Sequence, residues 1–157
     1  MKICLLTIGK TSTAYLREGI EEYTSRISKM GQFEIRSLPD VKSSRKLTPE
    51  LQKISEGELI LGQFQGGDYV ILLDERGKEY TSREFSGMIN RLSQIVGKTL
   101  YFIVGGPYGF SADVYARANA MMSLSKMTFP HEMVRLFFVE QLYRAFAISR
   151  NLPYHHD

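Results

Sequence analysis

The sequence has little cysteine and no long apolar run. Its 157 residues include a single cysteine, Cys4, which excludes an internal disulfide and a cysteine-based zinc site. No apolar stretch approaches the roughly 18 residues that a membrane-spanning helix needs. The apolar run at the N-terminus is not followed by a small-residue cleavage site, which argues against a secretory signal peptide. We therefore expect a soluble cytoplasmic protein that binds no membrane.

No residue type and no sign of charge dominates the chain. Hydrophobic residues make up 43% and charged residues 24%, which excludes a disordered or fibrous protein. The length suits one domain, residues 1–157, that can bury a core without disulfides. The formal net charge of +3 permits binding to nucleic acid but does not require it.

The two common nucleotide-binding motifs are also missing. The glycine-rich segment Gly105-Gly106-Pro107-Tyr108-Gly109 does not match G-x-G-x-x-G, and it follows a late apolar segment instead of the first one. It also lacks the Gly-Lys-Ser/Thr ending of a phosphate-binding loop. A doubly wound enzyme that uses NAD or ATP is therefore poorly supported.

Short apolar segments alternate with amphipathic ones along the chain. Strands are predicted at residues 2–8, 33–38, 69–73 and 100–104, with a short one inside 122–128. Helices are predicted at residues 14–31, 49–63 and 81–97, after Ser111, and at 130–148, with a loop at 74–78. Thr48 followed by Pro49, a capping box of Thr81 and Glu84, and Ser111 are the predicted caps of three of these helices. This alternation predicts an α/β fold, with a mostly parallel sheet covered by helices on both faces.

Three segments near strand ends are candidates for a ligand site. Glycines in Gly105–Gly109 allow a close approach of the backbone to a ligand, although they equally suit a tight turn. Leu73-Asp74-Glu75 lies at the same sheet edge if the two strands are neighbours, but taken alone it favours two solvated carboxylates. Residues 123–131 suit a small amphipathic ligand, or an ordinary strand followed by a helix start.

The last helix and the tail carry charged side chains and histidines. Glu140 and Arg144 have the i, i+4 spacing that is typical of a surface ion pair, yet Arg135 and Arg144 lie among aromatic residues. The tail, residues 151–157, is either frayed or docked, and a docked tail would present its histidines as proton-transfer groups. No third ligand is spaced to join them, so no metal site is expected.

The ordered set of these motifs resembles a known family. It consists of Leu72-Leu73-Asp74, Gly105-Gly106-Pro107-x-Gly109, Leu124-Ser125-x-x-Thr128-x-Pro130-His131-x-x-x-Arg135, Glu140-Gln141-x-Tyr143-Arg144-Ala145 and Pro153-Tyr154-His155. In this order and spacing the residues resemble the ribosomal RNA large subunit methyltransferase H family, which belongs to the SPOUT superfamily. The resemblance covers the whole chain, although its N-terminal half matches by layout more than by motif.

The resemblance implies an α/β fold with a C-terminal trefoil knot, a homodimer, and S-adenosylmethionine (SAM) bound in the knot without a metal. It implies methylation of N3 of a pseudouridine in the helix 69 loop of 23S ribosomal RNA, on assembled ribosomes. Carried over by position, the residues at the SAM site are Leu73, Gly105, Gly106, Leu124, Ser125, Lys126, Met127, Thr128 and Phe129.

The mechanistic hypothesis is in-line transfer of the methyl group to the imide nitrogen, whose proton must leave. We expect His155 to accept that proton, since histidine is a common general base in enzymes, and Arg144 to stabilise negative charge on the uracil carbonyls. Tyr154 would stack on the flipped base, and Glu140 would orient Arg144.

Two questions about partners stay open at this point. Four cations, Lys42, Arg45, Lys46 and Lys53, either form a patch that contacts ribosomal RNA or belong to a solvated loop and helix face. The alternatives to the implied activity are a ribosome-binding protein without methyl transfer and a SPOUT methyltransferase that acts on tRNA. The intact glycine segment and the Tyr154-His155 tail argue against the first of these.

Overall fold

The structure is a computed structural model that describes residues 1–41 and 47–156. Strands and helices alternate along this part of the chain. Their bounds are β1 (Lys2–Ile8), α1 (Ala14–Ser28), β2 (Phe33–Leu38), α2 (Pro49–Leu61), β3 (Tyr69–Glu79), α3 (Ser82–Ile95), β4 (Thr99–Val104), α4 (Ala112–Arg117), β5 (Ala120–Ser123) and α5 (His131–Ser149). Among the described residues, no helix combines the length and the apolar character needed to cross a membrane.

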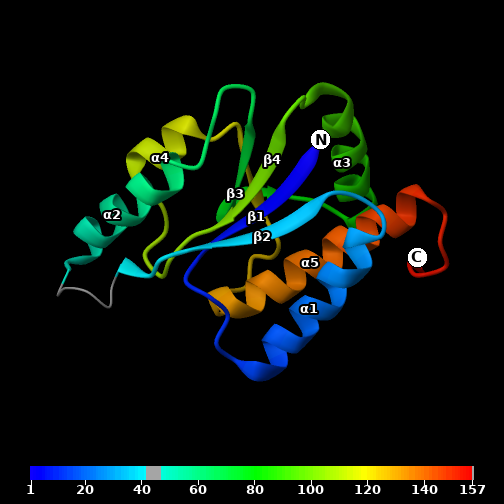
Figure 1. Cartoon of the computed structure of the whole chain (residues 1–157), viewed down its shortest axis with the longest axis horizontal. Coiled ribbons are helices and arrows are strands. Elements are labelled where there is room, and N and C mark those ends of the chain that lie inside the picture. The colour runs from blue at the N-terminus through cyan, green and yellow to red at the C-terminus, as the bar shows by residue number, and fades with distance from the viewer. Residues whose placement is uncertain (42–46, 157) are drawn as a thin grey trace.

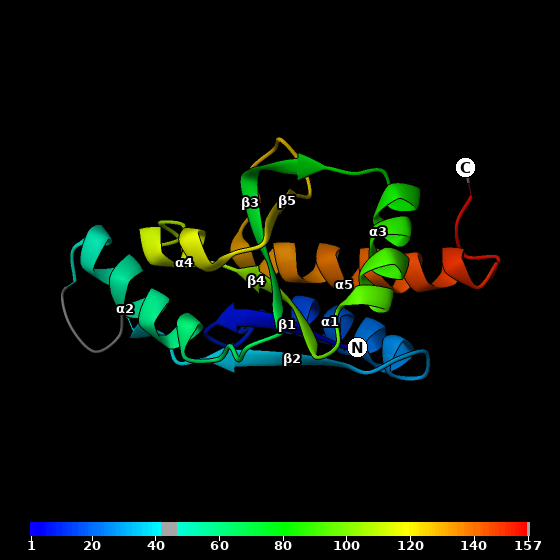
Figure 2. The same ribbon diagram turned by 90° about the horizontal axis from the view of Figure 1, so that it is seen from above.

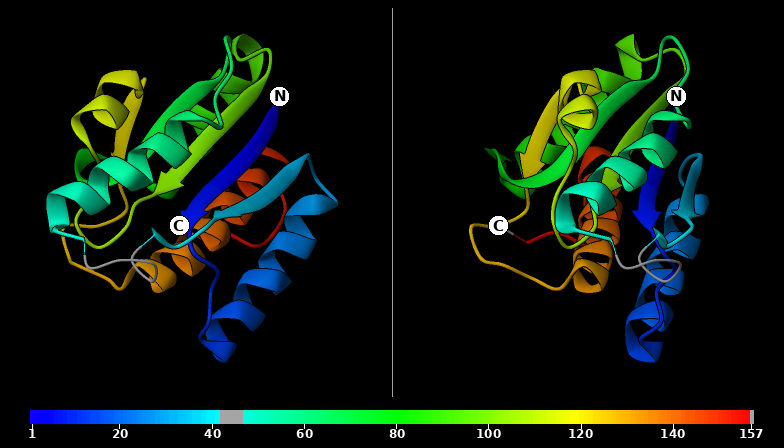
Figure 3. Two further views of the ribbon diagram at one scale, coloured as in Figure 1. Left: turned by 60° about the vertical axis from the view of Figure 1, so that its left-hand side comes forward. Right: turned by 90° about the vertical axis from the view of Figure 1, so that its left-hand side faces the viewer.

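The strands form one sheet in the order β2-β1-β4-β3-β5, and every neighbouring pair is parallel. Helices α2 and α4 cover one face of the sheet, and α1, α3 and α5 cover the other (Figures 1 and 3). The predicted α/β class is therefore confirmed. Parallel strands require crossover connections, and helices in those connections shield both faces from water.

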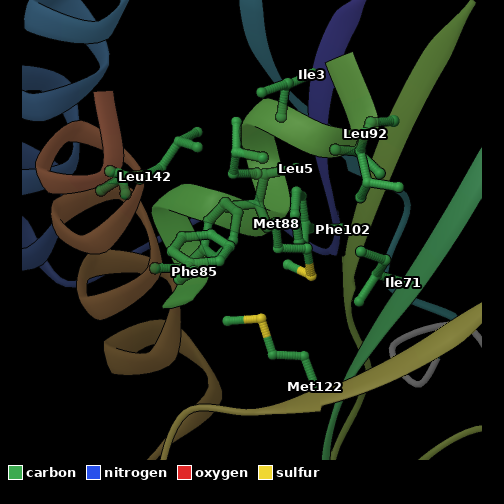
Figure 4. Close-up of a cluster of buried hydrophobic side chains, with 14 of the residues drawn as sticks. Ile3, Leu5, Ile71, Phe85, Met88, Leu92, Phe102, Met122 and Leu142 are labelled. Carbon is green, nitrogen blue, oxygen red and sulfur yellow. The ribbon is translucent and has the colours of Figure 1, made fainter. Parts of the chain in front are cut away.

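Each face of the sheet has its own hydrophobic core. Adjacent residues of β4 serve opposite faces: Phe102 packs among α3 and α5, and Ile103 packs toward α2 and α4. Both side chains are fully buried. On the first face, the Phe102 ring lies 4.7 Å from that of Phe138 and 5.9 Å from that of Phe85, between centroids (Figure 4). This explains why the strand segments are continuously apolar instead of alternating.

Side chains cap three of the helices as the sequence predicts. Thr81 and Glu84 form a reciprocal capping box at the start of α3. Thr48 accepts a hydrogen bond from the backbone of Leu51, with proline at the first position of α2, and Ser111 does the same for Val114 in α4. These caps fix where the helices begin, and with them the loops that precede each helix.

The segment before α1 is held by α5 instead of by its own cap. The Glu132 carboxylate accepts hydrogen bonds from the backbone of Ser12 and Thr13, and the Arg135 guanidinium donates to the Ile8 carbonyl and the Thr11 hydroxyl. Arg135 is only 2% exposed, and burial lowers its pKa. The first turn of α5 is thereby fixed to the carboxyl end of β1.

The prediction of a loop at residues 74–78 is wrong, because β3 continues to Glu79. Its pairing with β5 shifts: Leu73 and Lys78 both lie opposite Met122, so the intervening residues bulge out of the ladder. The chain can rejoin the ladder at Lys78 only because residue 77 is glycine, since a Cβ on Gly77 would lie 2.5 Å from the backbone nitrogen of Met122. Because the residues of the bulge are polar, the sequence pattern does not indicate that the strand continues beyond Leu73.

Gly77→Ala should lower the stability of the fold. The new methyl group meets backbone atoms of β5 that cannot move without breaking the ladder, so we expect a loss of about 2–3 kcal/mol in the free energy of unfolding. In a chain of this length that corresponds to a fall of about 5–10 °C in Tm, measurable by calorimetry. Gly87→Ala in α3 is the matched control, because nothing lies within 4 Å of its added Cβ. Equal Tm values for the two variants would contradict the close approach.

Candidate functional site

Three segments meet at the carboxyl edge of the sheet. Leu73 pairs with Val104 across β3 and β4, so the bulge of β3 and the segment that follows β4 leave the ladder side by side. The segment between β5 and α5 reaches the same place, and together they enclose a pocket of about 620 Å³. This is the position at which open α/β sheets bind ligands. The three segments proposed from the sequence therefore form one pocket.

The glycine segment is both a tight turn and a pocket wall. Gly109 donates its backbone N–H to the Gly106 carbonyl at 3.2 Å and has a φ of +83°, which favours glycine. A Cβ on Gly105 would lie 3.0 Å from the ring of Phe110. Gly105 and Gly106 line the pocket directly. Their missing side chains leave the backbone accessible from the pocket.

The segment after β5 forms the opposite wall. The Ser123 hydroxyl donates to the Ser125 carbonyl, and the Ser125 hydroxyl accepts from the backbone of Met127. Most of the predicted SAM-site residues line the pocket: Leu73, Gly105, Gly106, Leu124, Ser125, Met127, Thr128 and Phe129. Lys126 is not among the lining residues. Its ammonium is highly exposed and lies 3.8 Å from Glu79.

Asp74 is the ionised group in the pocket wall. Burial raises its pKa, but hydrogen bonds from Tyr115 and Arg76 outweigh burial and hold the pKa below its usual value. The expectation of two solvated carboxylates is wrong for Asp74, whose side chain is 8% exposed. The guanidinium of Arg76 also lies over the Tyr115 ring at 4.9 Å. Tyr115 was missed because only the fold brings it to Asp74. Arg76, two residues after Asp74, was missed because this segment was expected to be a solvated loop.

The four residues proposed for catalysis form a second cluster, on α5 and the tail. Arg144 donates to the Glu140 carboxylate and to Nδ1 of His155, the latter at 3.1 Å. The Tyr154 hydroxyl donates to Glu140 at 3.0 Å and lies 3.1 Å from the hydroxyl of Tyr23. The Glu140–Arg144 pair is partly buried, with side chains 20% and 24% exposed, so it is not an ordinary surface pair. The tail is docked through residue 155 and is not frayed.

The neighbours of Arg144 and Tyr154 determine their charge states. The hydrogen bond between Arg144 and Glu140 raises the pKa of Arg144. Burial raises the pKa of Tyr154, and hydrogen bonds with Tyr23 and Glu140 raise it further. The guanidinium also lies over the Tyr154 ring at 4.7 Å. Arg144 is therefore a fixed cation, held by its neighbours in one orientation.

The segment between β5 and α5 meets α5 at its start, whereas the tail leaves α5 at its other end (Figure 2). His131, the first residue of α5, lines the pocket. Arg144 comes 13 residues later, which places it about 20 Å further along the helix axis. Glu140 instead lines a smaller neighbouring cavity of about 410 Å³, which shares Ser123, Leu124, Ser125 and Phe129 with the pocket. None of the described tail residues, 151–156, lines the larger pocket.

Two further expectations concern metal and the basic patch. In the part of the chain that the structure describes, no group of three or more histidine, cysteine or acidic side chains is placed to hold a metal ion. Three cations of the proposed patch, Lys42, Arg45 and Lys46, lie outside the described residues. Lys53 is paired with Glu50 on α2 at 3.1 Å.

Comparisons with known proteins show the family to which the chain belongs. A family described as "Predicted SPOUT methyltransferase" matches residues 1–155. The chain is 52% identical over 157 residues to a ribosomal RNA large subunit methyltransferase H of Parabacteroides distasonis, with all of both chains covered. It is 51% identical over 156 residues to the protein of that name from Christiangramia forsetii, with 99% of each covered.

A solved structure of a probable methylase family protein from Haemophilus influenzae Rd KW20 has a TM-score of 0.52 at 12% identity. The match covers 99% of this chain and 70% of that one. At this identity the likeness bears on the fold alone. From the family match and the relatives about half identical over their full length, the chain belongs to the ribosomal RNA large subunit methyltransferase H family of SPOUT methyltransferases.

Proposed function

We propose that this protein transfers a methyl group from SAM to the ribosomal RNA of the large subunit. The observation that carries the proposal is the single pocket built from three separate segments at the carboxyl edge of the sheet, at the positions that the resemblance assigns to SAM. The names of the relatives support the class of substrate. The finer target is N3 of a pseudouridine in the helix 69 loop of 23S RNA, on assembled ribosomes in the cytoplasm.

The pocket fits a molecule of this kind. Its volume of about 620 Å³ lies within the usual range for small-molecule sites, and its walls combine apolar side chains with a few polar groups. Leu73, Leu124 and Phe129 supply apolar surface for adenine, and the ionised Asp74 favours a positively charged ligand. When bound, SAM supplies an electrophilic methyl carbon on a positively charged sulfur, so no metal is required.

Residues of the second cluster carry out the remaining steps. Arg144 stabilises the negative charge that develops on the uracil carbonyls when N3 loses its proton. The Tyr154 ring, packed edge-on against Tyr143 at 4.8 Å, offers a surface on which the target base stacks. A guanidinium only donates, so Nδ1 of His155 accepts from Arg144. Once the hydrogen bond with Arg144 breaks, Nδ1 of His155 accepts the proton that leaves N3 of the target base.

We further propose that the enzyme acts as a homodimer whose sites are shared. No residue of the cluster lines the pocket, and Arg144 lies about 15 Å along α5 from Val134, the nearest residue of this helix that does, so we infer that Arg144 does not touch a methyl group bound there in the same chain. A second copy that packs against α5 would bring one chain's tail to the other chain's pocket. Phe137, on the outer side of α5, is 39% exposed and suits such a contact.

His155→Ala should lower kcat by about a hundredfold, which is the usual contribution of a general base. SAM affinity should stay unchanged, because His155 acts on the target base and does not line the pocket of its own chain. The comparison is His155→Asn, which keeps an acceptor for Arg144 but does not titrate. If Asn restores full turnover, His155 only positions Arg144 and another group is the base. Single-turnover kinetics on ribosomes measure this.

The proposed function is tested by transfer of radiolabelled methyl from SAM to ribosomes from a strain that lacks this modification. Free 23S RNA and tRNA are run in parallel. We expect label on a pseudouridine of the large-subunit RNA, and much more with ribosomes than with free RNA. Label on tRNA would support the tRNA alternative. SAM binding without transfer to any RNA would indicate a ribosome-binding protein instead.

A further inference from the structure

Helix α2 is packed tightly behind the glycine segment of the pocket. Two of its consecutive residues, Glu56 and Gly57, are buried, and Glu56 is only 2% exposed. A Cβ on Gly57 would lie 2.5 Å from the Ser111 hydroxyl oxygen, which caps α4. Since Ser111 directly follows the glycine segment and Phe110, α2 fixes the end at which this segment enters α4.

The Glu56 carboxylate fills the space beside Gly106. A Cβ on Gly106 would lie 2.6 Å from both carboxylate oxygens, so the carboxylate occupies the volume that any side chain there would need. Gly106 lines the pocket. A buried acidic group therefore lies in contact with one residue of the pocket wall, although Glu56 itself does not line the pocket.

The carboxylate is held in place from its own helix. Gln52, one turn earlier and also buried, donates its side-chain amide to Glu56 at 3.2 Å. Burying a carboxylate is costly compared with filling the same space with an apolar side chain. Filling the space behind Gly106 does not by itself account for an acid at this position.

We propose that Glu56 is a positioning residue that holds residues 105–109 in the shape that closes the SAM pocket. This inference rests on the proposed function of the pocket. Glu56 acts through Gly106 and touches no part of the ligand. Its loss should therefore weaken binding of SAM and of the product S-adenosylhomocysteine alike, raise KM for SAM, and leave kcat at saturating SAM nearly unchanged.

The first test is Glu56→Gln, which keeps the shape of the side chain but replaces one acceptor oxygen with a donor. Either Gly106 or the Gln52 amide then faces an NH₂ group. We expect SAM affinity to fall about tenfold, because the glycine segment is then held less firmly in the shape that binds the ligand. Glu58→Gln makes the same exchange at an exposed position on α2 and should leave affinity unchanged. Equal affinities for the two variants, measured by calorimetry, would overturn the proposal.

The second test is a size exchange. Gly106→Ala alone places a methyl group against the carboxylate and should weaken SAM binding more than tenfold. Adding Glu56→Ala removes the clash, so the double variant should bind SAM better than Gly106→Ala alone. Strict additivity of the two losses would contradict a direct contact that matters for binding.

A third measurement separates this proposal from the proposed function. Hydrogen exchange of the backbone amides in residues 105–109, without ligand, should be faster in Glu56→Gln than in Glu58→Gln. If the unaltered protein does not bind SAM, the proposed function fails, while the exchange rates still decide whether Glu56 holds the segment. Unchanged exchange in Glu56→Gln would overturn the positioning role.

Discussion

Replacing Arg144 with alanine should lower methyl transfer to ribosomes by about a thousandfold, within the range seen when a group that stabilises developing charge is removed. The affinity for SAM should stay within about twofold of its original value, because Arg144 is remote from the pocket within its own chain. The effect should appear in kcat, since the interaction forms mainly as negative charge develops on the base.

The structure explains why this variant should still fold. Arg144 lies in the cluster with Glu140, but Glu140 keeps hydrogen bonds from Gln141 and Tyr154 when the guanidinium is lost. Arg144→Lys keeps the charge but loses the paired donors, so we expect it to recover only part of the activity. Arg91→Ala, at an exposed position of α3, is the control for loss of one positive charge. Equal turnover in Arg144→Ala and Arg91→Ala would remove Arg144 from the mechanism.

Two inactive variants should restore activity when they are combined in one dimer. Gly105→Val places its side chain against the Phe110 ring and obstructs the SAM pocket, while Arg144→Ala disables the cluster. If each site takes the pocket of one chain and the cluster of the other, a mixed dimer has one intact site and one with both defects. We expect about half of the original activity from a purified mixed dimer.

The experiment uses co-expression of the two variants with different affinity tags, followed by purification through both tags. Each variant alone, purified in the same way, sets the background. Activity of the mixed dimer no higher than this background would show that pocket and cluster must belong to the same chain. A monomer in solution, measured by light scattering, would contradict the dimer itself.

The sequence predicted most of the framework because its signals are local. The capping box at Thr81 and the apolar runs of β1 and β4 depend on neighbouring residues, and they were predicted correctly. The part of the pocket that consists of residues at strand ends was also predictable from the sequence. The continuation of β3 was missed because its bulge is polar and its return depends on the packing of Gly77 against β5.

Contacts between distant segments could not be predicted from one sequence. Tyr115 reaches Asp74 across 41 residues, and Arg135 reaches the Ile8 carbonyl across 127. Glu56 has no local pattern that separates it from the exposed Glu58, yet it lies against the pocket wall. The trefoil knot that the resemblance implies stays a prediction. What distinguishes these residues is burial, which follows from the whole fold.

The central claim is that the pocket between residues 73–76, 105–110 and 123–129 binds the methyl donor. A crystal structure with S-adenosylhomocysteine tests it most directly, because this product lacks the reactive methyl group. We predict that the ligand lies between Leu73, Gly105 and Leu124, with the tail of a second chain beside it. A ligand bound in the smaller cavity beside Glu140, or away from the glycine segment, would contradict the account.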